Sequence, residues 1–255
     1  MIDIHCHILP SVDDGPHMLE ESLRMGKLAM EEGVTSIVAT PHAFHPQFDS
    51  NNEWIKQKYL EVCAGFQEEG ILIDLYLGQE IRVSGELTTL LLNAKAMTIA
   101  NSRYVLIEFQ SDSVPAYVNQ LLFNLQLEGY VPIIAHPERN KEFAREPGRL
   151  FELVNAGALS QITTSSVTGD FGRHVQELAL TFLRNGLSQL IASDAHNTDC
   201  RSFNWTRTKE QIVDELGESM WEMYRKNAKA IIQDEPLQLP KPVLPVKNWR
   251  GKWKK

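Results

Sequence analysis

The 255-residue chain is poor in cysteine, has no long apolar run and carries no overall excess of basic residues. Its three cysteines, Cys6, Cys63 and Cys200, are too few and too scattered for a disulfide framework, which predicts a reducing compartment. No apolar run approaches the roughly 20 residues that a membrane-spanning helix needs. The first residues also lack the basic start and apolar block of a signal peptide. We therefore expect a cytoplasmic protein that is not transmembrane.

The surroundings of the cysteines exclude one kind of chemistry. Six positions after each cysteine stand Val12, Glu69 and Thr206, where a cysteine phosphatase loop would carry arginine. A phosphatase that uses a cysteine nucleophile with this spacing is therefore excluded.

Charge is distributed unevenly along the chain. The segment 236–255 contains six basic residues and no acidic one, so removing it changes the net charge from -8 to -14. Such an acidic body is a poor surface for nucleic acid, because binding to the phosphate backbone depends on Lys and Arg. We expect no nucleic-acid partner. The segment itself has four prolines and is predicted to be an extended tail that is able to make weak contact with an anionic membrane surface or an acidic partner.

Seven short apolar runs are predicted to be β-strands, and helical stretches separate them. The strands are Ile2 to His7, Ser36 to Thr40, Ile73 to Gly78, Tyr104 to Phe109, Val131 to His136, Leu159 to Thr163 and Gln189 to Ser193. The main helices are Leu19 to Glu32, Asn52 to Glu69, Val114 to Glu128, Leu150 to Ala156, Arg173 to Asn185, Trp205 to Leu216 and Ser219 to Gln233. Repeated strand–helix alternation predicts an α/β fold with a parallel sheet that closes into a barrel. We expect one domain over residues 1–235 and a basic, proline-rich tail over 236–255.

Side chains that bind metal ions stand at or just past the C-terminal ends of six predicted strands. They are His5, His7, His42, Glu80, Glu108, His136, Asp194 and His196, and Asp13 and Asp14 follow in the loop after the first strand. In a parallel barrel these ends open onto one face. One such residue alone is usually structural, but independent accidents at six strand ends are implausible. With one of the two aspartates, five histidines and four carboxylates exceed the needs of one ion, which predicts two or three.

The type of ligand limits the choice of metal. Imidazole and carboxylate ligands suit Mn, Fe, Zn or Mg better than a soft thiolate site would. Cys6 is expected to point away from its two histidine neighbours, because successive strand residues face opposite sides. The other histidines, His17, His45 and His174, are predicted to be surface residues rather than ligands.

Two arginines follow the last ligand positions. Arg139 lies in the sequence His-Pro-Glu-Arg-Asn after His136, and Arg201 lies five residues past His196. The planar guanidinium group matches phosphate oxygens, so both residues are predicted to orient a phosphoryl group above the metals. An ordinary ion pair with a loop carboxylate remains the alternative.

Six sequence stretches occur in a fixed order between Met1 and Asn197. They are MIDIHCHILPSVDDGP, ATPH, GQEIR, SRYVLIEF, IAHPERN and IASDAHN. In these motifs the chain resembles the polymerase and histidinol phosphatase (PHP) family, and within it the bacterial tyrosine phosphatases of capsule and exopolysaccharide operons. The resemblance implies a distorted seven-stranded (β/α)7 barrel that holds up to three metal ions, with Mn as the first expectation and Fe, Mg or Zn as alternatives.

The resemblance also assigns residues. The positions that match the family's metal ligands are His5, His7, Asp14, His42, Glu80, Glu108, His136, Asp194 and His196. Arg139 and Arg201 match its phosphate-contacting arginines, and Asp194 is a further candidate to supply a proton. No ligand position is substituted, so an active enzyme is expected.

The implied activity is metal-dependent hydrolysis of phosphotyrosine on a bacterial tyrosine kinase tail and on the kinase's substrates, which would regulate capsule or exopolysaccharide synthesis. Water activated by the metals would attack phosphorus without a covalent enzyme intermediate. The alternatives are a phosphatase of the histidinol-phosphate type and a non-catalytic, metal-stabilised subunit that binds the kinase. The acidic body disfavours a nuclease, and Glu108, where an amidohydrolase would need a bridging lysine, disfavours that class.

Overall fold

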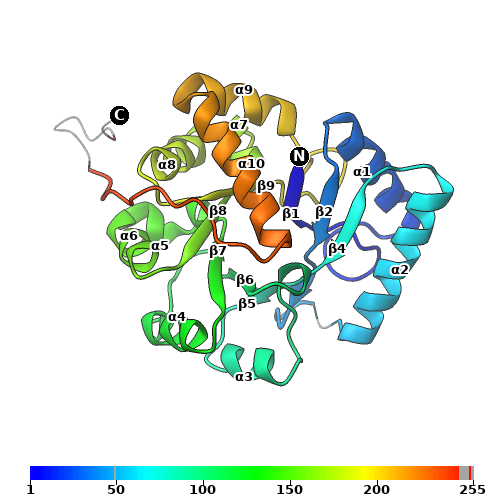
Figure 1. Ribbon diagram of the computed structural model, residues 1–255, viewed down its shortest axis with the longest axis horizontal. Helices are drawn as coiled ribbons and strands as arrows, with labels where there is room; N and C mark the ends of the chain where they lie inside the picture. The colour runs from blue at the N-terminus through cyan, green and yellow to red at the C-terminus, as the bar shows by residue number, and fades with distance from the viewer. Residues whose placement is uncertain (49, 247–252, 254–255) are drawn as a thin grey trace.

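Parallel β-strands run through the centre of the molecule and helices surround them (Figure 1). The structure is a computed structural model that describes residues 1–48, 50–246 and 253. In this part of the chain no helix is both long enough and apolar enough to cross a membrane. The repeated parallel pairing confirms the predicted α/β fold.

The strands form two parallel sheets. The first sheet has the order β1-β2-β4, with β1 over Ile2–Cys6, β2 over Ser36–Ala39 and β4 over Asp74–Leu77. The second has the order β3-β5-β6-β7-β8-β9, with β3 over His42–Ala43, β5 over Glu80–Arg82, β6 over Tyr104–Glu108, β7 over Val131–Ala135, β8 over Leu159–Thr163 and β9 over Leu190–Ala192. All seven predicted strands are present, and β3 and β5 are additional.

The additional strands lie just after two of the predicted strands, where the chain passes from the first sheet to the second. After β2, Pro41 interrupts the hydrogen-bond ladder because proline has no N–H group to donate. After β4, Gly78 lies against backbone, since a Cβ atom there would come 3.1 Å from the Cα of Ile99. The chain then re-forms pairing in the second sheet, where His42 and Glu80 are register partners. Two candidate ligands from distant motifs are thereby placed side by side.

The start of the chain meets the end of the last strand. The backbone N–H of Asp194 donates to the carbonyl oxygen of His5 at 2.9 Å, and the N–H of His7 donates to that of Ala195 at 2.9 Å. The backbone segment just after β9 therefore lies beside the end of β1.

Seven helices occupy the stretches predicted for them, with some shifts at their ends. They are α1 (Leu19–Glu31), α2 (Asn52–Glu68), α4 (Val118–Leu127), α6 (Pro147–Asn155), α8 (Arg173–Arg184), α9 (Trp205–Leu216) and α10 (Glu218–Ile232). The prediction that α4 begins at Val114 is wrong, because a residue before proline, here Pro115, disfavours helical backbone.

Short helical segments were not predicted. They are α3 (Leu87–Leu92), α5 (Lys141–Arg145), α7 (Thr164–Thr168) and the 3-10 turns η1 (Ile99–Asn101) and η2 (Pro137–Arg139). Each has six residues or fewer, which is too short for a clear helical periodicity.

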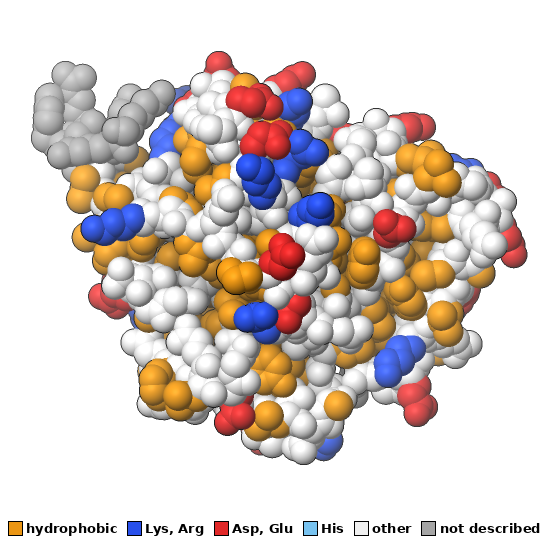
Figure 2. Space-filling view, viewed as in Figure 1, with side chains coloured by type: hydrophobic (Ala, Val, Ile, Leu, Met, Phe, Trp, Pro, Cys, Tyr) orange, Lys and Arg blue, Asp and Glu red, His pale blue; other side chains and the backbone are white. Residues whose placement is uncertain are grey.

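The strands separate two hydrophobic cores, as the alternation along β6 demonstrates. Val105 and Ile107 pack in the larger core, whereas Tyr104 and Leu106 pack in a smaller one. We call the smaller one the second core; it comprises Ile4, Val38, Ile99, Tyr104, Leu106, Ile133, Ala135, Leu159, Leu190, Ala192, Ala228 and Ile231. Helix α10 supplies the last two of these and crosses in front of the strands in Figure 1. The surface of this face mixes acidic, basic and apolar side chains (Figure 2).

The described part of the predicted tail has no helix or strand but is attached to the body. The N–H of Gln238 donates to the side-chain oxygen of Asn227 at 2.8 Å, and the N–H of Val243 donates to the carbonyl of Asn185 at 2.8 Å. Most of the predicted basic charge, namely Lys247, Arg250, Lys252, Lys254 and Lys255, lies outside the described residues.

Candidate metal centre

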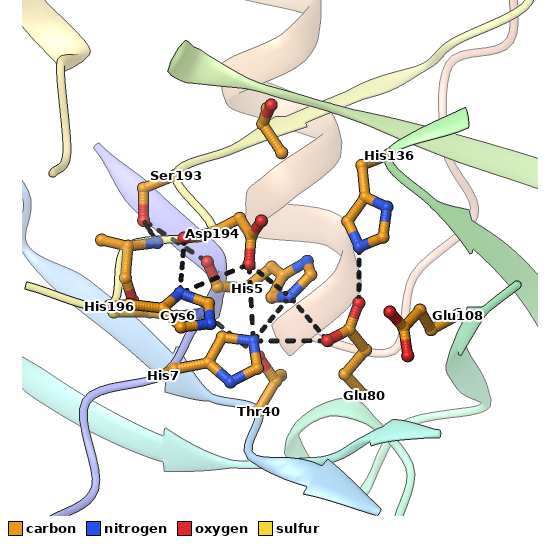
Figure 3. Close-up of polar contacts among 12 residues, drawn as sticks. His5, Cys6, His7, Thr40, Glu80, Glu108, His136, Ser193, Asp194 and His196 are labelled. Carbon is orange, nitrogen blue, oxygen red and sulfur yellow. Dashed lines mark hydrogen bonds and ion pairs between the residues drawn. The ribbon is translucent and has the colours of Figure 1, made fainter. Parts of the chain in front are cut away.

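The nine residues predicted as metal ligands lie together at or beyond the C-terminal ends of β1, β2, β4, β6, β7 and β9, and two of them, His42 and Glu80, also begin β3 and β5. They are His5, His7, Asp14, His42, Glu80, Glu108, His136, Asp194 and His196, and Figure 3 shows most of them converging from separate strands. All are buried except Asp14, Glu108 and His136, of which only Asp14 is exposed. The strand ends therefore gather imidazole and carboxylate groups in one place.

An irregularity in β1 gives the two first histidines their direction. The pairing of β1 with β2 shifts register between Asp3 and Cys6. Ile4 accordingly packs in the second core while Cys6, two residues further on, packs in the larger core. The Cys6 sulfur contacts the Ala195 carbonyl at 3.5 Å, so it does not join the histidines. The Nε2 atoms of His5 and His7 come within 3.2 Å of each other.

Hydrogen bonds at Nδ1 hold three imidazoles of the cluster in place. The Nδ1 of His5 lies 2.8 Å from Gln161 Oε1, that of His7 lies 2.7 Å from Asp13 Oδ2, and that of His196 lies 2.9 Å from the Asp194 carbonyl. Each partner is a hydrogen-bond acceptor, so in metal-loaded protein Nδ1 would carry the proton and Nε2 would bind the ion. Such a partner fixes the tautomer of a metal-binding histidine and directs its free nitrogen at the ion.

Glu80 lies at the centre of the cluster. Its Oε1 atom is 2.7 Å from His136 Nε2, and its Oε2 atom is 2.9 Å from His42 Nδ1 and 3.3 Å from His7 Nε2. Burial raises the pKa of this carboxyl, but the adjacent His5 and His42 outweigh burial and hold the pKa well below its usual range. An ionised carboxylate with imidazoles around both oxygens is suited to bridge two cations.

Asp194 faces two ways. Its Oδ1 atom lies 3.3 Å from His5 Nε2 and 3.4 Å from His7 Nε2. Its Oδ2 atom lies 2.5 Å from Arg139 Nη1 and 3.1 Å from Arg201 Nη2. This carboxylate therefore joins the histidine cluster to both predicted phosphate-binding arginines, and the predicted ion pair with a carboxylate is present within the site itself.

Asp14 joins two of the histidines to Arg201. Its Oδ1 atom lies 3.1 Å from His196 Nε2 and 3.5 Å from His42 Nε2, and its other oxygen pairs with Arg201 at 3.2 Å. Although burial raises its pKa, the neighbouring histidines lower it overall. Glu108 differs, because burial and the nearby Glu80 raise its pKa to about 7.

The donor set fits divalent cations. Five buried atoms in the cluster have charged neighbours but no aligned hydrogen-bond partner: His42 Nδ1, Glu80 Oε2, Glu108 Oε2, Asp194 Oδ1 and His196 Nε2. Three groups bring ligand atoms within 4.8 Å of one another, namely His7–Asp14–His42–His196, His5–His7–Glu80 and His42–Glu80–Glu108. Burial and Arg139 lower the pKa of His136 to about 4, so this imidazole is neutral and available near pH 7. Unpaired buried polar atoms are costly, and cations would satisfy them.

Strained backbone occurs at two of these positions. His136 has a φ of 33° and Asp194 has a φ of 54°, both in the left-handed region that residues other than glycine rarely adopt. Such conformations persist where the surroundings enforce them, and they concentrate at functional sites.

Three residues support the cluster without having been singled out as ligands. Asp13, weighed in the sequence as the weaker of two aspartates, holds His7 and also accepts the backbone N–H of His42 at 2.9 Å. Gln161 holds His5, and its signal was a polar side chain within an apolar strand. Arg82 lies 3.3 Å from Glu108, and its signal was its place in the GQEIR motif.

The predictions for the three other histidines are confirmed in part. His17 and His174 are exposed, as expected. His45, by contrast, is half-buried. Its ring stacks on that of His42 with 4.9 Å between the ring centroids, so His45 packs against the cluster and is not a free surface residue. Sequence periodicity gives no sign of this contact, because His45 lies in an irregular loop.

Fold and site together define an α/β protein with a buried centre that can hold several metal ions. Residues 1–233 match the family described as capsular polysaccharide synthesis, CpsB/CapC, and the chain belongs to this family. It is 42% identical over 256 residues to CapC of Staphylococcus aureus, with 98% of this chain and 99% of CapC covered. It is 37% identical over 245 residues to the tyrosine-protein phosphatase YwqE of Bacillus subtilis, with 95% and 96% covered.

A solved structure also matches this chain over almost its whole length. It comes from work on YwqE of Bacillus subtilis and CpsB of Streptococcus pneumoniae, described there as metal-dependent tyrosine phosphatases. It matches with a TM-score of 0.94 and 36% identity, covering 97% of this chain and 100% of the other.

Proposed function

We propose that this protein is a metal-dependent protein-tyrosine phosphatase, a phosphoric monoester hydrolase of capsular or exopolysaccharide synthesis. The observation that carries the proposal is the arrangement around Asp194, where a histidine and carboxylate cluster is joined directly to Arg139 and Arg201. Membership of the CpsB/CapC family and the phosphatase relatives support the same activity.

The nine clustered residues are the proposed metal ligands, and they would hold two or three divalent ions. Manganese is our first choice, with iron, magnesium or zinc as alternatives, because the donors are imidazoles and carboxylates without a thiolate. Bound ions would supply positive charge for the phosphoryl oxygens and would activate water for attack on phosphorus. Glu80, which lies among four imidazoles, is the proposed bridging residue.

The arginines are the proposed phosphoryl-binding residues. Their guanidinium groups are partly exposed and point to the outer oxygen of Asp194, so an arriving phosphate can take over these charge-assisted contacts. Phe171 lies against the Arg139 guanidinium, 5.1 Å from its ring centroid, and limits its movement. Fixed positive charge of this kind stabilises the charge that develops on the phosphoryl oxygens.

Asp194 is better suited to position these arginines than to donate a proton. Burial raises its pKa, but His5 and the neighbouring hydrogen bonds and charges hold that pKa well below its usual range. A strong acid is not required, since a tyrosine phenolate with a pKa of about 10 is a tolerable leaving group.

We also propose the finer points of the fold and the setting. The two sheets are interpreted as one distorted seven-stranded barrel, which is supported by the backbone hydrogen bonds between β1 and residues 194–195. The phosphatase domain would extend over residues 1–235, followed by the basic tail 236–255. The substrates would be phosphotyrosine proteins, chiefly the tail of a bacterial tyrosine kinase, and the cytoplasmic location stays a prediction of the sequence.

One set of assays tests this function. Manganese-loaded protein would be given a phosphotyrosine peptide, histidinol phosphate and single-stranded DNA, and its turnover compared with that of Arg139→Ala. Because losing one such donor costs about 100- to 1000-fold in turnover, R139A should lose peptide hydrolysis to that extent while its metal content stays unchanged. Arg173→Ala is the matched control, since Arg173 is exposed and pairs with Glu177 within α8.

The other outcomes are equally informative. Preferential turnover of histidinol phosphate would assign the protein to small-molecule phosphatases instead. No turnover of any substrate by metal-loaded wild-type protein would overturn the enzyme proposal and leave a kinase-binding subunit.

A further inference from the structure

Two aromatic rings that no ligand role requires lie beside the candidate metal centre. The ring of Phe48 is parallel to that of His42, with an interplanar angle of 3° and 5.4 Å between centroids. His45 stacks on His42 at 4.9 Å and on Phe48 at 5.0 Å. We call His45 and Phe48 the aromatic pair. Both residues are half-buried, so each keeps part of its surface open to solvent while its ring borders the cluster.

Hydrogen bonds hold the loop that carries the aromatic pair in a turn. The backbone N–H of Phe48 donates to the carbonyl of His45 at 3.1 Å, and that of Gln47 donates to His45 Nδ1 at 3.2 Å. Phe44, immediately before the turn, has a φ of 55°, which is a strained value for a bulky residue, and 43% of its surface is exposed. The chain therefore accepts strain and apolar exposure here to hold aromatic groups next to His42.

A ligand that binds beside the aromatic pair needs a flat apolar part close to a phosphate. Metal ions and the phosphoryl group itself gain little from a face of two rings, whereas the phenyl ring of phosphotyrosine carries its phosphate directly. Aromatic rings stack with centroids about 4.5 to 7 Å apart, the spacing that the aromatic pair already has with His42. Serine and threonine phosphates have no ring to offer.

We infer that His45 and Phe48 form the site that binds the phenyl ring of the substrate and so select aryl phosphates over alkyl phosphates. This inference rests on the proposed phosphatase function. It makes the loop after β3, which lies outside the recognisable motifs, the part of the chain that determines the substrate class.

Binding of two non-hydrolysable probes tests the inference separately from activity. Metal-loaded protein would be titrated calorimetrically with phenylphosphonate and with methylphosphonate, which share the phosphonate group and differ in the ring. A stacked ring contributes about 0.5 to 1.5 kcal/mol, so wild-type protein should prefer the phenyl probe by about 2- to 12-fold. Phe48→Ala should abolish most of this preference, and Phe48→Trp should retain it.

Controls separate ring binding from support of His42. Metal content and affinity for inorganic phosphate should be the same in wild type and F48A, because neither depends on the phenyl ring. Phe123→Ala removes a ring that is 54% exposed on α4 and should change nothing.

Kinetics on the same variants complete the test. F48A should lower kcat/KM for a phosphotyrosine peptide by about the same factor and lower kcat/KM for glycerol 2-phosphate by a clearly smaller factor. An unchanged phenyl preference in F48A, or equal losses for both probes, would overturn the inference. Wild-type protein that hydrolyses neither ester would instead count against the phosphatase function, whatever the probes show.

Discussion

The two ends of the strands differ in what stabilises them. The second core is apolar and lies mostly along the starts and middles of the strands, and helix α10 packs Ala228 and Ile231 onto it. At the C-terminal ends, buried histidines and carboxylates leave five polar atoms without an aligned partner. Packing alone satisfies the first region, whereas the groups of the second region are placed so that they could hold metal ions. The apolar core and the candidate metal ligands therefore occupy largely different parts of the same strands.

The largest effect on the histidine and carboxylate cluster is expected when its central carboxylate, Glu80, is removed. In Glu80→Ala four imidazoles lose their common neighbour, so the variant should bind less metal and lose more than about 100-fold in kcat/KM for a phosphotyrosine peptide. Metal content by mass spectrometry and steady-state kinetics measure both effects. The exposed Glu128→Ala serves as the control, and an E80A variant with normal metal content and turnover would contradict the role of Glu80.

An apolar truncation should have the opposite effect. Ile133 is fully buried in the second core, so Ile133→Ala should lower the free energy of unfolding by about 2 to 5 kcal/mol. Turnover per folded molecule should stay unchanged well below the unfolding transition. Denaturant unfolding measures the loss, and Leu127→Ala, at a side chain that is 68% exposed, should cost far less. Loss of turnover in folded I133A would show that the two ends are not separate.

A residue between the two regions should have an intermediate effect. Gln161→Leu keeps the approximate size of the side chain but removes the acceptor for His5 Nδ1, so metal affinity should fall by about 10- to 100-fold. Gln161→Glu keeps an acceptor there and should retain more affinity than Q161L. Titration with Mn²⁺ distinguishes them, and equal affinities in both variants would argue against orientation of His5 by this contact.

A change of pH should have a smaller effect, on the stability that Glu108 contributes to the polar region. In metal-free protein the pKa of Glu108 is raised from 4.5 to about 7 by burial and by Glu80, so the folded state favours its neutral form. A raised pKa contributes stability that is complete below pH 4.5 and is lost as the pH rises through about 7. Glu108→Gln stays neutral and should gain stability relative to wild type over this window, which pH-dependent denaturation measures. A constant difference between the two proteins from pH 4.5 to 7 would disprove the raised pKa.

The strand positions could be predicted because runs of Val, Ile and Leu are buried on both faces. The short strands β3 and β5 that follow Pro41 and Gly78 could not, because their pairing depends on which neighbouring strand each of them meets. Likewise, the polar, β-branched stretch of α7 has little helical signal of its own, and it becomes a helix where the chain leaves β8.

The clustering of the candidate ligands could be predicted because strand ends of a parallel sheet share one face. The residues that hold the candidate ligands in place through hydrogen bonds were harder to identify. Gln161 belongs to the sixth predicted strand, whose end carries no metal-binding side chain, and only the structure brings it to His5. Asp13 and Asp14 are adjacent in sequence and have different tasks, since one holds His7 from behind and the other faces His196.

The hydrogen bonds between β1 and the segment after β9 also concern how the protein is made. The Cys6 sulfur finds its carbonyl partner 189 residues further along the chain. At a synthesis rate of about 5 to 20 residues per second, His5 and His7 leave the ribosome about 10 to 40 seconds before Asp194 and His196. The clustered residues can therefore come together only after Asp194 and His196 have been made, and chains that stop earlier lack the carboxylate that joins the histidines to the arginines.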